Sequence, residues 1–222
     1  MRRRIMLMLG LLGTLAIPTR AGTFSPAPVA PELGLDALTK RVAREQLGKQ
    51  LFGDPWATVT LSHVDVYDRF PYLEARHFLV VSDPAWNRLV YGEIGKTLHA
   101  FDGAGLATGA LREPRGLAVD DQDRVYVADA GHGRVLVLQA LSDFGDLSLT
   151  PVYAIDGLSA PHGVAWSDAG TPFEPGDDML FVTDTGRNRV AAYALGAQSA
   201  RLVSTLGSLG SGDGHFAGPM AI

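Results

Sequence analysis

The chain has 222 residues, of which 46% are hydrophobic, and its formal net charge at pH 7 is -5. This length and composition are sufficient for a globular core and argue against a disordered chain. The 24 acidic residues outnumber the 19 Lys and Arg residues, and no basic run follows the N-terminus, so no nucleic-acid partner is expected. Because the sequence contains no cysteine, disulfides, thiolate zinc sites and cysteine nucleophiles are excluded.

Residues 1–21 have the pattern of a secretory signal peptide. Three arginines follow Met1, residues 5–17 are apolar, and residues 19–21 form a small-x-small sequence suited to cleavage before Gly22. The apolar run is too short to span a bilayer comfortably, and an uncleaved membrane anchor is the alternative. We therefore predict export to the periplasm or the extracellular space, with no membrane span after cleavage.

The next segments lead to the main domain. Residues 22–34 contain three prolines and predict an extended linker. Residues 35–51 carry an apolar stripe at helical spacing behind Asp36, a suitable N-cap, and predict a short helix. We expect this helix to precede or pack on the next domain, with partner binding as the alternative. Residues 52–75 leave two alternatives, an incomplete first repeat unit or a strand that pairs elsewhere.

Residues 76–222 contain a repeat, and its best-defined unit lies at residues 111–138. That unit predicts three short strands at residues 116–119, 124–128 and 134–138, separated by polar turns. A three-stranded meander cannot bury both of its faces alone. Similar strand and turn sequences come before and after it, so the chain itself supplies the neighbours that such a unit needs.

Each unit contains an aspartate that is followed five positions later by an arginine. The three pairs are Asp83 and Arg88, Asp129 and Arg134, and Asp184 and Arg189. The aspartates recur at an interval close to the roughly 40–50 residues of propeller blades, and an insertion at residues 169–178 lengthens the second interval. We predict that these pairs are structural, with the carboxylate accepting turn N–H groups and the guanidinium pairing with it or with nearby carbonyls.

Two glycines are expected to shape these turns. Gly131 and Gly186 lie two positions after the aspartate, where they are predicted to adopt a positive φ. The first unit has Ala85 at this position and Pro84 before it, which puts the geometry of its turn in doubt.

The pattern Pro-x-Gly-(apolar)-Ala-Val-Asp, followed by Val-Tyr-Val-Ala-Asp-x-Gly-x-x-Arg-Val, resembles the NHL repeat of six-bladed β-propellers. Residues 212–222 resemble the opening of one more repeat. The resemblance covers roughly residues 76–222 and implies an all-β fold, an incomplete NHL-type β-propeller of about three blades plus a further first strand at Pro219. Because propellers close with about four to eight blades, we expect a fragment of a longer protein, with assembly of several copies as the alternative.

The residue after the proline at the start of each innermost strand is expected near the central channel, where a propeller would bind a ligand. These residues are Arg115, His162 and Met220. NHL-like amidating lyases place zinc-binding histidines at matching Pro-His positions, and Pro161-His162 fits that pattern. One imidazole cannot hold zinc alone. We therefore predict a hydrogen-bonded residue at the channel mouth, with a metal ligand as the alternative for His162.

Other motifs give little support for a cofactor. Asp120, Asp121 and Asp123 are hard ligands of the kind that Ca²⁺ prefers, but they lack EF-hand spacing and lie at a predicted hairpin turn. The glycines of residues 103–109 do not have dinucleotide-binding spacing, and no G-x-S-x-G or H-E-x-x-H motif occurs.

Clear repeat units without a complete catalytic set favour a binding protein over an enzyme. We predict an exported NHL-propeller scaffold that engages a protein or a small-molecule ligand through its loops and channel mouth. One alternative is a zinc- or calcium-dependent lyase or hydrolase that uses His162 with residues beyond residue 222. Another is a structural array that only spaces other domains.

Overall fold

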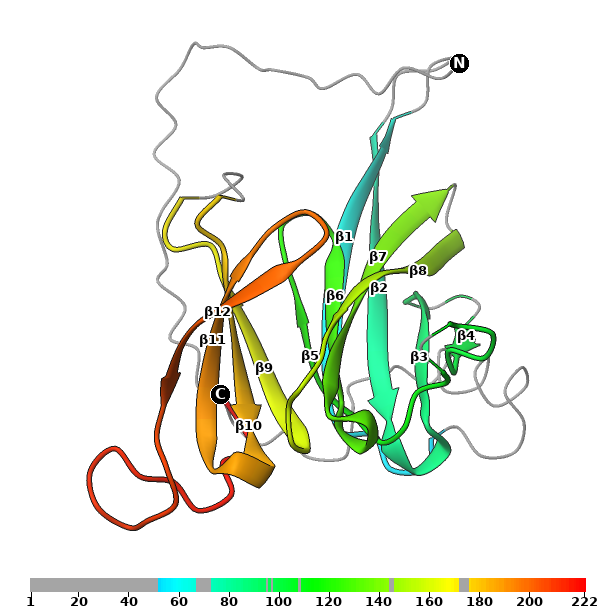
Figure 1. Cartoon of the computed structure of the whole chain (residues 1–222). Helices are drawn as coiled ribbons and strands as arrows, with labels where there is room; N and C mark the ends of the chain where they lie inside the picture. The colour runs from blue at the N-terminus through cyan, green and yellow to red at the C-terminus, as the bar shows by residue number, and fades with distance from the viewer. Residues whose placement is uncertain are drawn as a thin grey trace.

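The computed structural model describes residues 52–66, 73–94, 96, 98–107, 109–143, 146–171 and 176–222. The predicted signal peptide, linker and helix of residues 1–51 lie outside these ranges. The described chain is all-β and forms three four-stranded antiparallel sheets (Figure 1). In this part of the chain no helix is long and apolar enough to cross a membrane.

Each sheet is a meander of four consecutive strands. The first contains β1 (Thr58–Val66), β2 (Leu73–Asp83), β3 (Arg88–Glu93) and β4 (Leu98–Phe101). The second contains β5 (Pro114–Val119), β6 (Arg124–Asp129), β7 (Arg134–Asp143) and β8 (Asp146–Ile155). The third contains β9 (Pro161–Ser167), β10 (Met179–Asp184), β11 (Arg189–Leu195) and β12 (Ala200–Leu206). The second and third strands of each sheet are joined by a 3-10 turn, namely η1 (Pro84–Trp86), η2 (Ala130–His132) and η3 (Thr185–Arg187).

The first sheet begins earlier than the sequence predicts. The repeat region was expected from residue 76, but β1 pairs with β2 from Thr58 opposite Val81 to Val66 opposite Leu73. The segment whose role the sequence left open therefore supplies a full strand of this sheet. The sequence contained a signal for this strand, a proline at its beginning. Pro55-Trp56-Ala57 lies before β1, just as Pro114-Arg115-Gly116 lies at the start of β5.

The second sheet is packed on both faces, which explains the composition of β6, in which every residue is buried. Successive side chains of a strand point to opposite faces. Val125 and Val127 belong to the cluster that includes Phe78 of the first sheet, whereas Tyr126 belongs to the cluster that includes Leu180 of the third. Full burial of such a side chain contributes about 1.5–3 kcal/mol, so these two clusters hold the sheets together.

Strands β1, β5 and β9 are the sheet edges that face one another at the centre of the described structure, and we call them the inner strands (Figure 1). Their close approach depends on glycine. A Cβ atom on Gly116 would overlap the carbonyl oxygen of His162, and one on Gly163 would lie 2.9 Å from the carbonyl oxygen of Met220. Only glycine lets two backbones come so close. The arrangement is consistent with a β-propeller-like fold.

The substitution Gly116→Ala is expected to lower the free energy of unfolding by about 1–3 kcal/mol, because the added methyl group would push β5 away from β9. Urea denaturation of the purified chain measures this change. Gly176→Ala is the matched control, since a Cβ there would meet nothing within 4 Å. Equal unfolding midpoints for the two variants would show that the inner strands are not in close contact.

Residues 207–222 follow β12, and they contain one isolated parallel bridge, between Leu209 and Phe216. The strand predicted to begin at Pro219 is not formed, because no described strand pairs with residues 219–222. The segment is nevertheless held against the third sheet. The Thr185 hydroxyl donates a hydrogen bond to the Pro219 carbonyl at 2.6 Å, and the Gly218 N–H donates one to Asn188 Oδ1 at 2.8 Å.

Candidate functional site

The three sequence-predicted Asp–Arg pairs form ion pairs at one end of the sheets, where the 3-10 turns lie (Figure 1). The Nε–Oδ2 distances are 3.2 Å for Arg88–Asp83, 2.7 Å for Arg134–Asp129 and 2.8 Å for Arg189–Asp184. The other carboxylate oxygen accepts a backbone N–H from the loop before the inner strand of the same sheet. The donors are Gly53 at 2.9 Å, Arg112 at 2.7 Å and Ser159 at 2.6 Å. Each buried aspartate therefore joins its turn to the loop before the inner strand.

Gly131 and Gly186 do not have the positive φ that the sequence predicts for them. The left-handed residue lies four positions after the aspartate instead, where it caps the 3-10 turn. These residues are Asn87 with φ 51°, Gly133 with φ 63° and Asn188 with φ 52°. Asparagine and glycine tolerate this conformation best. The correction matters because it assigns the two glycines a different role.

That role is close packing. In the second and third turns a Cβ on the glycine would overlap the side chain of Arg112 or Ser159, the residue whose N–H binds the aspartate. In the first turn Ala85 takes the glycine's place, and the residue that faces it is Gly53. In the first sheet the glycine of this contact therefore lies in the loop before β1 and not in the turn. The first turn, whose geometry the sequence left in doubt, is a 3-10 turn like the other two.

The left-handed asparagines also join neighbouring parts of the chain. Asn87 Oδ1, at the turn of the first sheet, accepts the backbone N–H of Glu113 before β5 at 2.8 Å. Asn188 Oδ1, at the turn of the third sheet, accepts the N–H of Gly218 at the same distance, 2.8 Å. Each contact therefore fixes the turn of one sheet to the Pro-x segment that comes next in the chain. That segment contains Arg115 in the first case and Met220 in the second. Sequence analysis missed this contact, although asparagine after a short helical turn is a signal for it.

The same end of the structure brings Arg115 and His162 together around a residue that the sequence analysis missed, Trp56. The Arg115 Cζ atom lies 4.7 Å from the centroid of the Trp56 ring. The His162 ring approaches that ring edge to face, with centroids 6.0 Å apart and an interplanar angle of 62°. The third predicted residue, Met220, follows Pro219 at the corresponding place, and its side chain is 54% exposed. Trp56, Arg115 and His162 are called the mouth cluster below.

His162 is a neutral hydrogen-bonding residue at neutral pH. Its Nδ1 atom lies 2.9 Å from the Ala160 carbonyl oxygen and must be the donor, which leaves Nε2 as an acceptor. Burial lowers the pKa of His162, the hydrogen bond to Ala160 raises it, and the positive charge of Arg115 lowers it further; the net direction is down. The imidazole is therefore uncharged above about pH 6.5, the ordinary value for histidine.

This pKa shift predicts a dependence of stability on pH. The folded-state pKa of His162 lies below that of the unfolded chain, so protonation favours unfolding, and stability should fall as the pH drops below about 6.5. Urea denaturation at several values between about pH 7.5 and pH 5 measures the slope. His162→Asn should reduce the slope, because it removes this titrating group. An unchanged slope in His162→Asn would contradict the prediction.

An open hollow of about 400 Å³ lies beside the mouth cluster. Its lining residues are Asp54, Pro84, Ala85, Asn87, Arg112, Glu113 and Arg115. They come from η1 and the residue that caps it, from the loop before β1, and from the loop that leads into β5 together with the start of β5, so the hollow lies between the first two sheets. Its two arginines and two carboxylates balance in formal charge. Arg115 belongs both to the mouth cluster and to the wall of the hollow.

The described residues do not assemble the metal sites considered for the sequence. No group of three or more His, Asp or Glu side chains among them could hold a metal ion. His162 has an aromatic ring and a guanidinium as neighbours, and a cation there disfavours a second cation. Asp120, considered for Ca²⁺, instead accepts hydrogen bonds from the Gln122 N–H, the Arg124 N–H and the Tyr126 hydroxyl at 2.8–3.0 Å.

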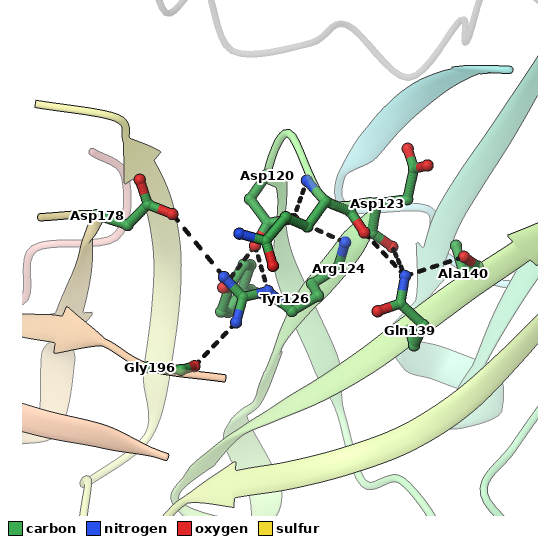
Figure 2. A network of polar contacts seen from close by, with 9 residues as sticks. Asp120, Asp123, Arg124, Tyr126, Gln139, Ala140, Asp178 and Gly196 are labelled. Carbon is green, nitrogen blue, oxygen red and sulfur yellow. Dashed lines mark hydrogen bonds and ion pairs between the residues drawn. The ribbon is translucent and has the colours of Figure 1, made fainter. Parts of the chain in front are cut away.

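Arg124 opens β6 at the end of the strand away from the 3-10 turn, and it joins the second and third sheets (Figure 2). Its Nε donates to Asp120 Oδ2 at 2.5 Å and its Nη1 donates to the Gly196 carbonyl oxygen at 2.9 Å, while Nη2 lies 3.9 Å from Asp178 Oδ2. Burial and the nearby Asp121 carboxylate raise the pKa of Asp178. The sequence analysis missed this network, although an arginine that opens an otherwise apolar strand was a signal for it.

The fold and the turns together define an all-β repeat protein, and comparison with known families identifies the repeat. Residues 111–138 match the family model of the NHL repeat, which confirms the resemblance read from the sequence. A search of curated proteins found no match. Among solved structures, the chain is similar to a functionally unknown protein from Desulfotomaculum acetoxidans DSM 771, with 10% sequence identity and a TM-score of 0.44. The similarity covers 73% of this chain and 58% of that one, so the chain spans little more than half of that protein.

Proposed function

We propose that this protein is an exported binding scaffold, an NHL-type β-propeller that holds a protein or small-molecule partner at the mouth cluster. The NHL repeat supports the scaffold assignment, because such repeats commonly mediate protein interactions. Three sheets with facing inner strands support a propeller, and the repeated contact from each left-handed asparagine to the following Pro-x segment supports a common axis. The pattern of residues 1–21 supports export to the periplasm or the extracellular space.

The observation that carries the proposal is the convergence of three large side chains, each following a proline, at or just before the start of the inner strands. Trp56, Arg115 and His162 lie together beside an open hollow, and Trp56 is 38% exposed. Tryptophan and arginine are the residue types that most often dominate binding energy at interfaces. The carboxylates of the Asp–Arg pairs and of the Arg124 network, by contrast, are buried, so the mouth cluster is the better candidate for recognition.

A photocrosslinking amino acid at Asp54 tests the proposal in cells that export the full chain. Asp54 is exposed and lines the hollow. The matched position is Leu141 of β7, which is 43% exposed and lies at the opposite end of the sheets. We expect a discrete crosslinked partner from Asp54 only, and we expect Arg115→Ala to abolish it while Arg201→Ala leaves it unchanged. Crosslinks of equal yield from both positions, or no change with Arg115→Ala, would contradict the proposal.

Export has a separate test. Deletion of residues 2–21 is expected to leave the protein in the cytoplasm, whereas the full chain should be found in the periplasmic or extracellular fraction in a shortened form. Mass spectrometry of the exported N-terminus identifies the cleavage site, which we expect before Gly22. Full-length protein that stays in the membrane fraction would favour an uncleaved anchor instead.

A further inference from the structure

Arg115 differs from the arginines of the three turns in what it binds. Arg88, Arg134 and Arg189 each contact a fully buried aspartate at 2.7–3.2 Å. The carboxylate beside Arg115 is Glu113, whose side chain is 52% exposed and whose Oε2 lies 3.5 Å from Arg115 Nη2, the outer limit of a hydrogen bond. In the part of the chain that the structure describes, the buried Arg115 Nε has no hydrogen-bond partner. A guanidinium has five N–H donors, so most of this donor capacity is unused.

The position of this guanidinium is nevertheless well defined. It stacks on the Trp56 ring, with Cζ 4.7 Å from the ring centroid, and the side chain is only 23% exposed. The backbone beneath it is fixed as well, because the Ser82 hydroxyl of the first sheet donates a hydrogen bond to the Arg115 carbonyl oxygen at 2.5 Å. A donor group that is already oriented and partly desolvated loses little entropy when it binds an acceptor.

The charges around the hollow indicate which acceptor fits. Arg112 and Arg115 attract an anion, but Asp54 and Glu113 line the same hollow. A group with one negative charge meets less repulsion there than a dianion such as phosphate. A carboxylate carries one charge and has the two-oxygen geometry that matches the terminal nitrogens of arginine. Neutral His162 adds no positive charge that would favour a dianion.

We propose that Arg115 binds a carboxylate presented by a peptide segment of the partner, with the rest of the segment lying in the hollow. The carboxylate would accept hydrogen bonds from both terminal nitrogens of the guanidinium and displace Glu113 from its weak contact. The open hollow leaves room for an extended segment. This carboxylate belongs either to the chain terminus or to an Asp or Glu side chain. The inference rests on the proposed function, because it names the chemical group that the scaffold recognises.

His162 provides a direct readout of this binding. The positive charge of Arg115 lowers the pKa of His162, and the negative charge of Glu113 raises it. Glu113 lines the hollow and would stay nearby after losing its contact with Arg115, so a bound carboxylate adds one negative charge and should raise that pKa. The signal of the His162 ring can be followed by NMR during a pH titration, with His162→Asn giving the assignment. A structural role of Arg115 alone would not couple this pKa to an added peptide.

Four probes distinguish the sources of the carboxylate. They are acetyl-trialanine with a free C-terminus, the same peptide as its C-terminal amide, acetyl-Ala-Glu-Ala-amide, and inorganic phosphate. We expect saturable binding and a raised His162 pKa with the first or the third probe, and no effect of the amide. A response to the first probe only assigns a chain terminus, and a response to the third only assigns an acidic side chain. Phosphate binding as tight as that of the carboxylate peptides would overturn the inference.

Variants of Arg115 complete the test. Arg115→Gln should weaken carboxylate binding about tenfold or more, because it removes a charged hydrogen-bond donor. Arg115→Lys should restore part of the affinity as a point charge, and the matched variant Arg201→Gln should bind like the parent chain. Urea denaturation confirms that each variant is folded. If a partner crosslinks at Asp54 but no carboxylate probe binds, the scaffold function stands and this inference is wrong. If a carboxylate probe binds but no partner crosslinks, only the scaffold function is wrong.

Discussion

Replacement of Asp129 by alanine is expected to lower the free energy of unfolding by about 3–5 kcal/mol, the usual cost of removing one partner of a buried ion pair. The Asp129 carboxylate is fully buried and binds Arg134 Nε at 2.7 Å and the Arg112 N–H at 2.7 Å. Its loss would leave the Arg134 guanidinium, whose side chain is 4% exposed, without its aspartate. Urea denaturation of the purified variant measures the change.

The equivalent substitution in the third sheet provides a matched comparison. Asp184→Ala removes the corresponding two contacts and also an ion pair with Arg187, whose Nη1 lies 3.1 Å from Asp184 Oδ2. The side chains of Arg189 and Arg187 are 26% and 44% exposed, so water can replace part of what they lose. We therefore expect a smaller cost than for Asp129→Ala, while Asp213→Ala, at an exposed position, should cost little. Equal costs for the two turn aspartates would mean that burial of the arginine does not decide the effect.

Replacement of Arg124 by methionine should have a comparably large effect, also about 3–5 kcal/mol, for the same physical reason. The side chains of Arg124 and Asp120 are 4% and 0% exposed. Methionine fills a similar volume but leaves the Asp120 charge without its cation, and it removes the hydrogen bond to the Gly196 carbonyl oxygen that ties the second sheet to the third. Urea denaturation gives the cost, and hydrogen exchange should show faster opening at β10 and β11.

Asp178→Asn serves as the control within the same network. Asp178 lies 3.9 Å from Arg124, and its Oδ2 has no hydrogen-bond partner among the described residues. Its pKa is raised above that of the unfolded chain, so its ionisation costs folded-state stability as the pH rises through that raised value. The neutral variant should therefore be at least as stable as the parent at pH 7 and gain less at about pH 4. A loss as large as that of Arg124→Met would show that Asp178 is an essential partner.

The strands that the local sequence pattern specifies were predicted well. Residues 124–128 and 134–138 alternate around a turn that begins with Asp129, and they lie within β6 and β7 of the structure. Residues 52–75 were left open between an incomplete first repeat unit and a strand that pairs elsewhere, because the tryptophan and alanine after Pro55 replace the residues that mark the other inner strands. The structure places β1 in the first sheet. The roles of Gly131 and Gly186 were mistaken, because a sequence does not distinguish a glycine that needs a positive φ from one that faces another residue closely.

The candidate site was predicted only in part, since it depends on contacts between sheets. Arg115 and His162 were chosen for their place after a proline, and the structure brings both to the ring of Trp56. Met220 occupies the corresponding place but remains exposed, so its part in binding is still a prediction. The Arg124 network could not be predicted from the local sequence, because Arg124 and the carbonyl group it binds are 72 residues apart.

The mouth cluster lies beside the 3-10 turns, whereas β7 ends and β8 begins at the opposite end of the sheets (Figure 1). We therefore expect residues added between β7 and β8 to leave the mouth cluster undisturbed. This makes the β7–β8 hairpin the natural attachment point for a dye, an affinity peptide or a solid support. A molecule tethered there would keep Trp56 and Arg115 turned toward the surrounding solution, which is the orientation that a search for its partner requires.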